Sequence, residues 1–395
     1  MVTSHDLRPL VVHVMHRFDV GGLENGIVNL INRLAPERFR HAVVALTEVT
    51  DFRRRVERDD VQFIAMHKPP GQGLWLMPKM RQVFRDLRPA IVHTRNLAAL
   101  EMALPAALAG VPIRIHGEHG WDASDPNGTS RKFRLVRRVY RPFVHQYVAL
   151  SWHLERYLVN HVGIADDRIT QVYNGVDTRR FRPADEGRAM IAGSPFAQSD
   201  LWLIGTVGRL QAVKDQVLLA RAFVRAIELA PAARARLRLV IAGDGPLRGA
   251  VQRVLQDGGV EGLAWLAGER NDVPELLRGL NAFVLPSLAE GISNTILEAM
   301  ATALPIVATN VGGNAELLED HRTGRLVPAG TVDTMASALL EDFERPEEAG
   351  RRGCAARIDV EKRFSLDAMV AAYADLYECS LQRAAARGAL VHRLN

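Results

Sequence analysis

The chain has 395 residues, which is too long for one ordinary hydrophobic core and therefore indicates two domains. Hydrophobic residues make up 48% of the sequence and charged residues 24%, a balance typical of folded globular proteins that excludes bulk disorder. The formal net charge is only +5, and we expect no nucleic-acid partner.

No segment predicts membrane insertion or secretion. The apolar runs have the length of strands, and none approaches the roughly 20 residues that a transmembrane helix needs. Residues 1–18 lack both a basic leader and a long apolar segment, so we expect no signal peptide. Cys354 and Cys379 share no metal-binding or redox spacing, which favours a reducing cytoplasm.

Short apolar runs alternate with helical patterns in the first half of the chain. The runs are rich in Val, Ile, Leu and Ala, as expected of parallel strands that are buried on both faces. The predicted strands cover residues 10–15, 41–46, 61–66, 90–94, 112–116 and 146–151, and clear helical patterns cover residues 23–35 and 77–87.

The same pattern restarts after a polar, small-residue stretch at residues 181–200. The predicted strands of the second half cover residues 202–208, 237–243, 263–268, 281–286 and 305–309. Two successive βα arrays predict an α/β protein with two doubly wound domains, whose ligands bind near the carboxyl ends of the strands. We place these domains at residues 1–185 and 186–365, and expect residues 366–395 to form a helix that packs back toward the first domain.

The segments that follow the strands carry the candidate chemistry. Gly21 and Gly22 follow the first strand and would let backbone amides approach a phosphate, although this pair alone is more often a plain turn. Arg209 and Lys214 follow the strand at 202–208, and two cations at the mouth of a parallel sheet suit a diphosphate. No G-x-G-x-x-G sequence is present at the first turn, so a dinucleotide fingerprint is missing.

The stretch EGISNTILEAM at residues 290–300 contains two glutamates eight positions apart. Thr295 and Glu298 have the spacing of a capping box, which predicts that a helix begins there. Glu290 and Glu298 would then be carboxylates aimed at one ligand. Taken alone, the stretch is better explained by a solvated glutamate in a loop and another that favours the helix dipole.

The segment at residues 130–143 predicts a basic amphipathic helix. Four arginines fall on one face at helical spacing and apolar residues fall on another. The arginines are Arg134, Arg137, Arg138 and Arg141, and the apolar residues are Phe133, Val136, Tyr140 and Phe143. Such a helix could lie on an anionic membrane or an acidic partner, or its arginines could simply face water, and these interpretations stay open.

In this order, the motifs resemble those of the retaining glycosyltransferases of the GT-B fold, specifically family four, which uses nucleotide-sugar donors. The resemblance runs from about residue 10 to about residue 375, and also points to bacterial transferases of exopolysaccharide gene clusters. The matching segments are VGGLE (20–24), GEHGWD (117–122), VYNGVDTRRF (172–181), GRLQAVKD (208–215), IAGDGP (241–246), GERNDVPELL (268–277), residues 287–318 and TGRLVP (323–328).

The resemblance implies a role for each matching position. Glu290 binds hydroxyls of the donor sugar and supports the reacting centre, and Glu298 binds the ribose. Arg209 and Lys214 stabilise the departing diphosphate. The remaining donor-binding positions are Gly22 beside the phosphates, Glu269 and Arg270 beside the base, and Gly291, Ile292, Ser293, Asn294 and Thr295 at the helix N-terminus.

The resemblance also implies a histidine that touches the donor sugar. Two candidates, His116 and His119, occur in the segment IRIHGEHGWD. We prefer His119, because it lies past the end of the predicted strand, whereas His116 is better explained as a hydrogen-bonded core residue.

The function implied is transfer of a hexose from a UDP- or GDP-sugar to a hydroxyl of a glycan or lipid-linked acceptor, with retained anomeric configuration. The chain contains no Asp-x-Asp sequence, so we expect no metal and no other cofactor. Any membrane contact would be peripheral, at the inner face of the cytoplasmic membrane through residues 130–143. The alternatives are a nucleotide-sugar epimerase and a catalytically silent GT-B subunit that binds lipid or a partner.

Overall fold

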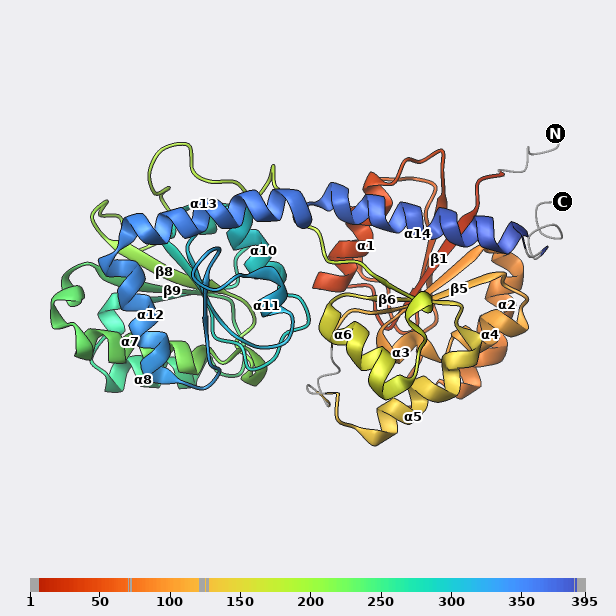
Figure 1. Ribbon diagram of the computed structural model, residues 1–395, viewed down its shortest axis with the longest axis horizontal. Coiled ribbons are helices and arrows are strands. Elements are labelled where there is room, and N and C mark those ends of the chain that lie inside the picture. The colour runs from red at the N-terminus through yellow and green to blue at the C-terminus, as the bar shows by residue number, and fades with distance from the viewer. Residues whose placement is uncertain are drawn as a thin grey trace. The chain divides into compact units, whose positions relative to one another are not determined.

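The computed structural model describes residues 7–69, 71, 73–120, 125, 128–386 and 388. The chain divides into two compact units (Figure 1). Unit 1 comprises Met1–Asn174 and Asp367–Asn395, and unit 2 comprises Gly175–Leu366. Trp121 and Asp122, which belong to one of the matched motifs, lie outside the described residues.

The boundary between the units lies earlier than the predicted position after residue 185. Residues 175–185 belong to unit 2 because their backbone bonds there: Val176 donates to the Phe364 carbonyl at 2.9 Å and accepts from Leu366 at 3.0 Å. Gly175 packs so closely that a Cβ at this position would lie 2.7 Å from the Cα of Leu366. The polar composition of residues 181–200 therefore did not locate the boundary.

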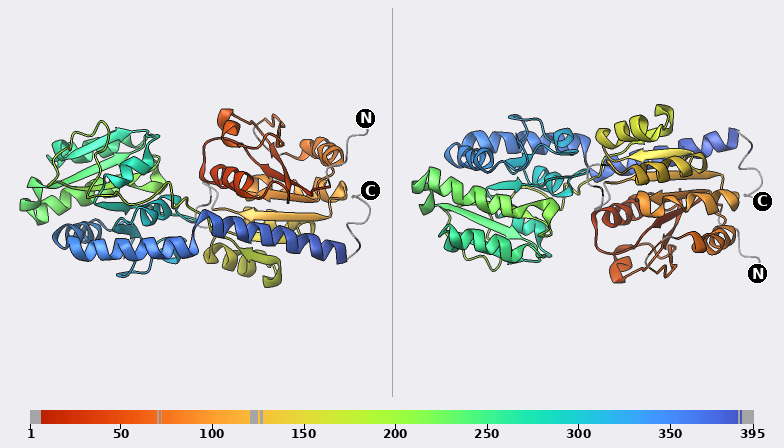
Figure 2. Two further views of the ribbon diagram at one scale, coloured as in Figure 1. Left: turned by 90° about the horizontal axis from the view of Figure 1, so that it is seen from above. Right: turned by 90° about the horizontal axis from the view of Figure 1, so that it is seen from below.

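Unit 1 is built on a seven-stranded parallel sheet with the order β3-β2-β1-β4-β5-β6-β7. Its strands are β1 (Leu10–Met15), β2 (Arg40–Ala45), β3 (Gln62–Ala65), β4 (Ile91–Arg95), β5 (Ile113–Glu118), β6 (Gln146–Ala149) and β7 (Ile169–Gln171). Its α-helices are α1 (Gly22–Arg33), α2 (Met77–Leu87), α3 (Asn96–Leu100), α4 (Ala103–Leu108), α5 (Arg131–Tyr140), α6 (Trp152–Tyr157) and α14 (Leu366–Ala386). Helices cover both faces of this sheet (Figure 2).

Unit 2 is built on a six-stranded parallel sheet with the order β10-β9-β8-β11-β12-β13. Its strands are β8 (Trp202–Val207), β9 (Leu237–Ala242), β10 (Ala264–Gly268), β11 (Ala282–Leu285), β12 (Ile306–Thr309) and β13 (Arg325–Val327). Its α-helices are α7 (Gln216–Leu229), α8 (Arg248–Asp257), α9 (Val273–Arg278), α10 (Asn294–Ala301), α11 (Asn314–Leu317), α12 (Val332–Glu344) and α13 (Pro346–Arg363).

Every strand predicted from an apolar run is present within one residue of its predicted bounds, apart from β5, which ends two residues beyond its prediction, and β6, which ends two residues before. The sequence prediction missed β7 and β13. Each has only three residues and lies at the edge of its sheet, so neither is a long buried apolar run.

A row of buried histidines crosses the sheet of unit 1. His13 on β1 pairs in register with His93 on β4. Nε2 of His13 lies 3.1 Å from Nδ1 of His41 on β2. Helix α14 covers this row, because Tyr377 bonds Nδ1 of His93 at 3.0 Å and stacks edge-on against Phe39. The C-terminal helix therefore completes the core of unit 1 with polar as well as apolar contacts.

Burial keeps these histidines neutral. It lowers the pKa of His13 and His93 well below 6.5, and together with the nearby Arg58 it lowers the pKa of His41 to about 3. The unfolded chain therefore binds more protons than the folded chain once the pH drops below about 6.5. The stability that the neutral rings provide is present above that pH and is lost as the pH falls toward the folded pKa values.

We predict that unit 1 is selectively sensitive to acid. Each of the three histidines can cost about 1.4 kcal/mol at pH 5.5, so the total loss from pH 7.5 is up to roughly 4 kcal/mol. Hydrogen exchange by mass spectrometry, corrected for intrinsic rates, should show protection falling in β1 and β4 but not in β8 and β9. The sheet of unit 2 is the internal control, because His321 is the one histidine between residues 175 and 366. Equal losses in both sheets would contradict the histidine explanation.

Candidate functional site

The strand order places the candidate residues at two switch points. In unit 2, β8 has β9 on one side and β11 on the other, and Lys214 and Glu290 follow β8 and β11. In unit 1, β1 has β2 and β4 as neighbours, and Gly22 follows β1. Ligands of doubly wound sheets bind at these points, outside the carboxyl ends of the strands.

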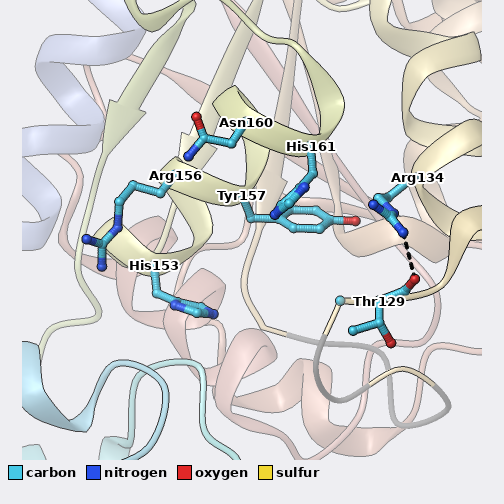
Figure 3. A pocket seen from close by; sticks show the side chains of 8 residues that line it. Thr129, Arg134, His153, Arg156, Tyr157, Asn160 and His161 are labelled. Carbon is cyan, nitrogen blue, oxygen red and sulfur yellow. Dashed lines mark hydrogen bonds between the residues drawn. The ribbon is translucent and has the colours of Figure 1, made fainter.

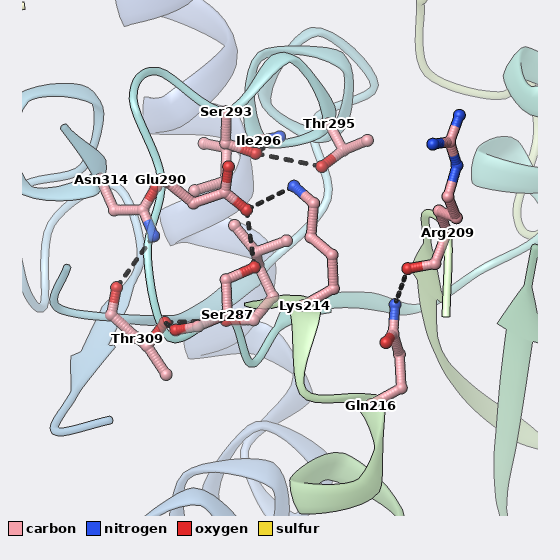
Figure 4. A network of polar contacts seen from close by, with 11 residues as sticks. Arg209, Lys214, Gln216, Ser287, Glu290, Ser293, Thr295, Ile296, Thr309 and Asn314 are labelled. Atoms are coloured by element: carbon pink, nitrogen blue, oxygen red, sulfur yellow. Dashed lines mark hydrogen bonds and ion pairs between the residues drawn. The ribbon is translucent and has the colours of Figure 1, made fainter. Parts of the chain in front are cut away.

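An ion pair joins the two loops at the switch point of unit 2 (Figure 4). Lys214 Nζ donates to Oε1 of Glu290 at 2.6 Å, and the Ser287 hydroxyl donates to the same oxygen at 2.6 Å. The Glu290 side chain is only 8% exposed, whereas Lys214 keeps 31% of its side chain exposed. Lys214 therefore balances the charge of a carboxylate that is largely buried and still faces solvent itself.

Backbone contacts hold the Glu290 loop in place. Leu288 donates its N–H to the Val213 carbonyl at 2.8 Å, which ties the loop to the segment that carries Lys214. The Thr309 hydroxyl donates to the Ser287 carbonyl at 2.6 Å, and Asn314 Nδ2 donates to the Thr309 carbonyl at 3.0 Å. Thr309 and Asn314 are both fully buried, so this support is rigid.

Two glycines after β12 let another backbone segment approach the Glu290 loop. A Cβ on Gly312 would lie 1.8 Å from the Glu290 carbonyl oxygen, and one on Gly313 would lie 2.1 Å from the Gly291 carbonyl oxygen. The Gly313 N–H donates to that Gly291 oxygen at 2.9 Å. Any side chain here would displace the Glu290 loop. Both glycines and Ser287 lie within the matching segment at residues 287–318, but the sequence analysis assigned none of them a role.

Helix α10 begins beside the ion pair. Ser293 is its N-cap, and the Ser293 hydroxyl accepts from the N–H of Ile296 at 3.3 Å and lies 3.1 Å from the Thr295 hydroxyl. The predicted capping box at Thr295 and Glu298 was wrong, because Thr295 is already inside the helix. The cap lies two residues earlier, where the extended backbone of Ser293 directs its hydroxyl at the first turn. Gly291 and Ile292 lead into this cap, and Asn294 is the first helical residue.

Glu298 lies in the second turn of α10 and makes no hydrogen bond through its side chain to the described residues. Burial raises its pKa to about 7, although Arg180 acts in the opposite direction. A carboxyl group with this environment is half protonated near neutral pH. Hydroxyl groups of a ligand would supply the donors that an ionised Glu298 lacks.

Arg209 does not join the Lys214–Glu290 cluster. Its side chain is exposed and extends away from the ion pair in Figure 4, while its carbonyl accepts from Gln216 Nε2 at 3.1 Å. The GDGP turn after β9 supports this loop, because a Cβ on Gly243 would lie 2.0 Å from the Gly208 carbonyl oxygen. Arg209 therefore remains available to an anionic ligand.

Glu269 and Arg270 follow β10, as predicted. Glu269 is exposed, but the Arg270 guanidinium binds Asp272, with Nε 2.8 Å from Oδ1, and stacks on Trp265 at 5.6 Å. Because the head group of Arg270 is already engaged, only its backbone is left to meet a base.

In unit 1, Gly22 is the first residue of α1, and Gly21 is its cap. The Glu24 side chain folds back against the cap position. A Cβ on Gly21 would lie 2.1 Å from Oε2 of Glu24, so only glycine leaves room for this carboxyl group. Burial raises the pKa of Glu24. The glycine pair thus brings backbone and a carboxyl group together at the start of the helix.

The two candidate histidines have different surroundings. His116 is fully buried, and its ring nitrogens lie 2.8 Å from the Thr94 hydroxyl and 3.3 Å from Oε1 of Glu118. This confirms that His116 is a hydrogen-bonded core residue. His119 lies just beyond β5, partly exposed, and lines a small cavity with residues of α1.

The basic helix α5 differs from its prediction at one arginine. Arg137 is only 4% exposed, because its Nε lies 2.6 Å from Oε1 of the buried Glu118. Burial alone would raise the pKa of Glu118, but the Arg137 guanidinium outweighs it and lowers that pKa to about 2. Helical spacing grouped Arg137 with the outward arginines, but the buried carboxylate holds it inside.

The other three arginines donate to backbone carbonyls: Arg134 to Thr129, Arg138 to His161 and Arg141 to Gly163. Across the part of the chain that the structure describes, none of the helices has the length and apolar character needed to cross a bilayer.

Two family models match most of the chain between them. One is described as "Glycosyltransferase Family 4" and matches residues 20–180, and the other is described as "Glycosyl transferases group 1" and matches residues 202–344. The chain belongs to the group 1, family 4 glycosyltransferases. The resemblance of its motifs to this family is thus confirmed.

Curated relatives of this glycosyltransferase cover much of its length. It is 30% identical over 261 residues to the UDP-Gal:alpha-D-GlcNAc-diphosphoundecaprenol alpha-1,3-galactosyltransferase of Escherichia coli, a match that spans 63% of this chain and 65% of that protein. It is 25% identical over 360 residues to the putative glycosyltransferase EpsF of Bacillus subtilis (strain 168), which covers 86% of this chain and 88% of EpsF.

A solved structure shares the fold. Anabaena Alr3699/HepE, crystallised in complex with UDP-glucose, superposes on this glycosyltransferase with a TM-score of 0.76 at 19% identity, covering 94% of this chain and 99% of that one. Two parallel-sheet α/β units and this likeness confirm the predicted GT-B fold.

We predict that nucleotide binding to this glycosyltransferase weakens as Glu298 becomes protonated. If ribose hydroxyls donate to the ionised carboxylate, affinity is highest above pH 7 and falls up to tenfold for each pH unit below it. Calorimetric titration of UDP and GDP from pH 5.5 to 8.5 measures this dependence. Glu298→Gln is the matched control, because its amide does not titrate. The phosphate of the nucleotide titrates in the same range, but it affects the affinity of both proteins equally. Parallel pH profiles in the two proteins would contradict the ribose assignment.

Proposed function

We propose that this glycosyltransferase moves a hexosyl unit from a UDP- or GDP-sugar to a hydroxyl of a glycan or lipid-linked acceptor, with retention of configuration and without a metal. The observation that carries the proposal is the Lys214–Glu290 pair beside the N-terminus of α10. The E. coli relative is named for a UDP-galactose donor and a diphosphoundecaprenol-linked acceptor, and the Anabaena structure holds UDP-glucose. We place this transfer in exopolysaccharide or lipid-linked glycan assembly, as the resemblance of the motifs implies.

The two charges of the pair have separate roles in this proposal. Oε1 of Glu290 accepts from both Lys214 and Ser287, which leaves Oε2 without a partner among the described residues. Oε2 can therefore accept a hydrogen bond from a hydroxyl of the donor sugar. Lys214, with donors to spare on its ammonium group, faces the diphosphate.

In the reaction, the bond between the anomeric carbon and the diphosphate oxygen breaks, and a bond from that carbon to the acceptor oxygen forms. The leaving diphosphate gains negative charge, which Lys214, Arg209 and the N-terminus of α10 stabilise. The acceptor proton passes to the departing phosphate on the same face, which retains the anomeric configuration. Protein cations thus supply the charge stabilisation that a bridging metal supplies elsewhere.

The proposal predicts a nucleotide-sugar-dependent, EDTA-resistant activity. A panel of UDP- and GDP-sugars, incubated without acceptor, should show slow hydrolysis of one donor, and proton NMR of early products should show the anomeric configuration of the donor. Calorimetry with the same nucleotides distinguishes the silent subunit, which would bind none of them. Inversion of configuration, or loss of activity in EDTA with recovery in Mn²⁺ or Mg²⁺, would contradict the proposed mechanism.

The exposed face of α5 supports a peripheral membrane location. Leu135 and Val139 lie one turn apart and are 62% and 54% exposed, and Arg131, Lys132 and Arg138 flank them. Apolar side chains framed by cations are typical of helices that lie in the interface of an anionic membrane. Arg137, which the sequence placed on this face, is excluded because it is buried.

A basic cavity adjoins this face (Figure 3). It has a volume of about 340 Å³, and Arg134, His153, Arg156 and His161 contribute cationic or hydrogen-bonding nitrogens to its wall. Arg134 is anchored by its bond to the Thr129 carbonyl at 2.9 Å. No carboxylate is among the described residues of the lining. The cavity therefore suits the phosphate groups of a lipid-linked acceptor.

We predict that the exposed cations of α5 attach the protein to anionic vesicles. Each is worth about 1 kcal/mol near such a surface, so Arg131→Gln, Lys132→Gln and Arg138→Gln together should weaken binding about 100-fold. Co-sedimentation with phosphatidylglycerol-rich vesicles measures the change, and added salt should also weaken wild-type binding. The matched control removes the same charge from Arg53, Arg54 and Lys79, which are exposed elsewhere on unit 1. Equal binding of the α5 variant and wild type would contradict the membrane role.

A further inference from the structure

A buried arginine without a carboxylate partner stands next to His119. Arg95, the last residue of β4, is 2% exposed and forms no ion pair within the described residues. Its Nη1 lies 2.9 Å from Nε2 of His119 and 3.1 Å from the hydroxyl of Tyr373 on α14. The guanidinium also stacks on the ring of Tyr373, at 5.2 Å, and its Nη2 lies 3.5 Å from Nδ1 of His13.

This contact dictates the protonation of His119. A guanidinium has only donors, so Nε2 of His119 must accept, and the proton of the neutral ring must then be on Nδ1. A protonated His119 would set two donors and two positive charges against each other. Burial lowers the pKa of His119 well below 6.5, and the charge of Arg95 lowers it further.

The chain leaves space for this ring and fixes its backbone. A Cβ on Gly117 would lie 2.5 Å from Nε2 of His119, so the glycine allows the ring to fold back toward Arg95. The N–H of His119 donates to Oδ1 of Asn96 at 2.7 Å. Asn96 itself has a φ of +58°, in the left-handed region that asparagine tolerates better than most residues.

The opposite nitrogen of the ring is available to a ligand. His119, Arg95 and Tyr373 line a small cavity together with Asn174 and with residues of α1 that include Gly26. Nδ1 of His119 has no hydrogen-bond partner among the described residues. The cavity has a volume of only about 10 Å³, which is room for one oxygen and not for a sugar ring, and an N–H donor at Nδ1 is suited to such an oxygen.

We propose that Arg95 is a positioning residue, which fixes His119 as a neutral ring with its proton on Nδ1 so that this N–H can donate to a hydroxyl of the sugar. Tyr373 holds Arg95 from the other side, so the C-terminal helix takes part in setting the site. The inference rests on the proposed function for the identity of the ligand, but the protonation of His119 can be measured without any substrate.

Other titratable groups lie close to Arg95 and His119. His13 approaches Arg95 from β1, and on β4 and β5 His93, His116 and Glu118 act on the same region. Glu118 favours a protonated His119, but it is already neutralised by Arg137. Burial and the charge of Arg95 together therefore keep His119 neutral, with burial the larger cause.

The test compares Arg95→Met and Tyr373→Phe with wild type, and uses Arg33→Gln as a control. The control removes the contact of α1 with Asp367 at the start of α14 but leaves Arg95 untouched. Long-range ¹⁵N–¹H NMR of protein labelled in histidine reports the tautomer and charge of His119, with the signal assigned by loss in His119→Gln. The pH dependence of kcat and the affinity for UDP are measured on the same proteins.

In wild type and Arg33→Gln we expect His119 to carry its proton on Nδ1 at all pH values from 5.5 to 8. In Arg95→Met the proton should move largely to Nε2, the pKa of His119 should rise although burial still holds it below its usual range, and kcat should fall at least tenfold. UDP affinity should stay within twofold. Tyr373→Phe should move part of the His119 proton from Nδ1 to Nε2. This variant provides the test of the proposal if Arg95→Met does not fold.

Two results would overturn the proposal. One is a wild-type His119 with its proton on Nε2, and the other is an unchanged tautomer in both Arg95→Met and Tyr373→Phe. Because the NMR measurement needs no donor, a failure of the proposed transferase activity would be recognised separately from a failure of this inference.

Discussion

The ion pair between Lys214 and Glu290 is the interaction on which the candidate site depends. A carboxylate that is 8% exposed is costly to bury alone, and removing the partner of such a charge typically costs 3–5 kcal/mol in a fully buried setting, less here because Lys214 reaches solvent. The pair joins the loops after β8 and β11, the two strands at the switch point of the sheet. Ser287 and Gly312 serve this arrangement, one by a hydrogen bond to the carboxylate and the other by the close approach of backbone. The donor site is therefore built by loops that the sheet brings together, and not by any one segment.

Unit 1 also contains a buried charge, Arg95, but its partners are neutral polar groups and not a carboxylate. Arg95 is surrounded by neutral rings, and their lone pairs and hydroxyls replace the carboxylate that a buried guanidinium usually finds. Helix α14 supplies Tyr373 to Arg95 and Tyr377 to the neighbouring His93, from nearly 300 residues further along the chain. The C-terminal helix is therefore more than a structural cover, because the polar core of the first unit is incomplete without it.

The sequence was sufficient for the longer strands, because buried parallel strands are continuous apolar runs, while the donor-site residues that the matching motifs imply stay predictions. It was insufficient where a tertiary contact decided the outcome. Helical spacing placed Arg137 outside, but the buried Glu118 draws it in. The pair Thr295 and Glu298 had the spacing of a cap, yet the backbone is extended at Ser293, and the helix begins there. Arg95 gave no signal in the sequence, since it closes an ordinary strand and acquires its partners from β1, from α14 and from the residue that follows β5.

The turnover of Lys214→Ala tests the central claim most directly. If Lys214 stabilises the departing diphosphate, kcat should fall by one to three orders of magnitude, in line with roughly 2–4 kcal/mol for a lost donor in the transition state. Lys214→Arg, which keeps the charge, should recover part of that loss, and melting temperatures establish that all three proteins are folded. Turnover of Lys214→Ala within about threefold of wild type, less than 1 kcal/mol, would remove Lys214 from the mechanism and contradict the account.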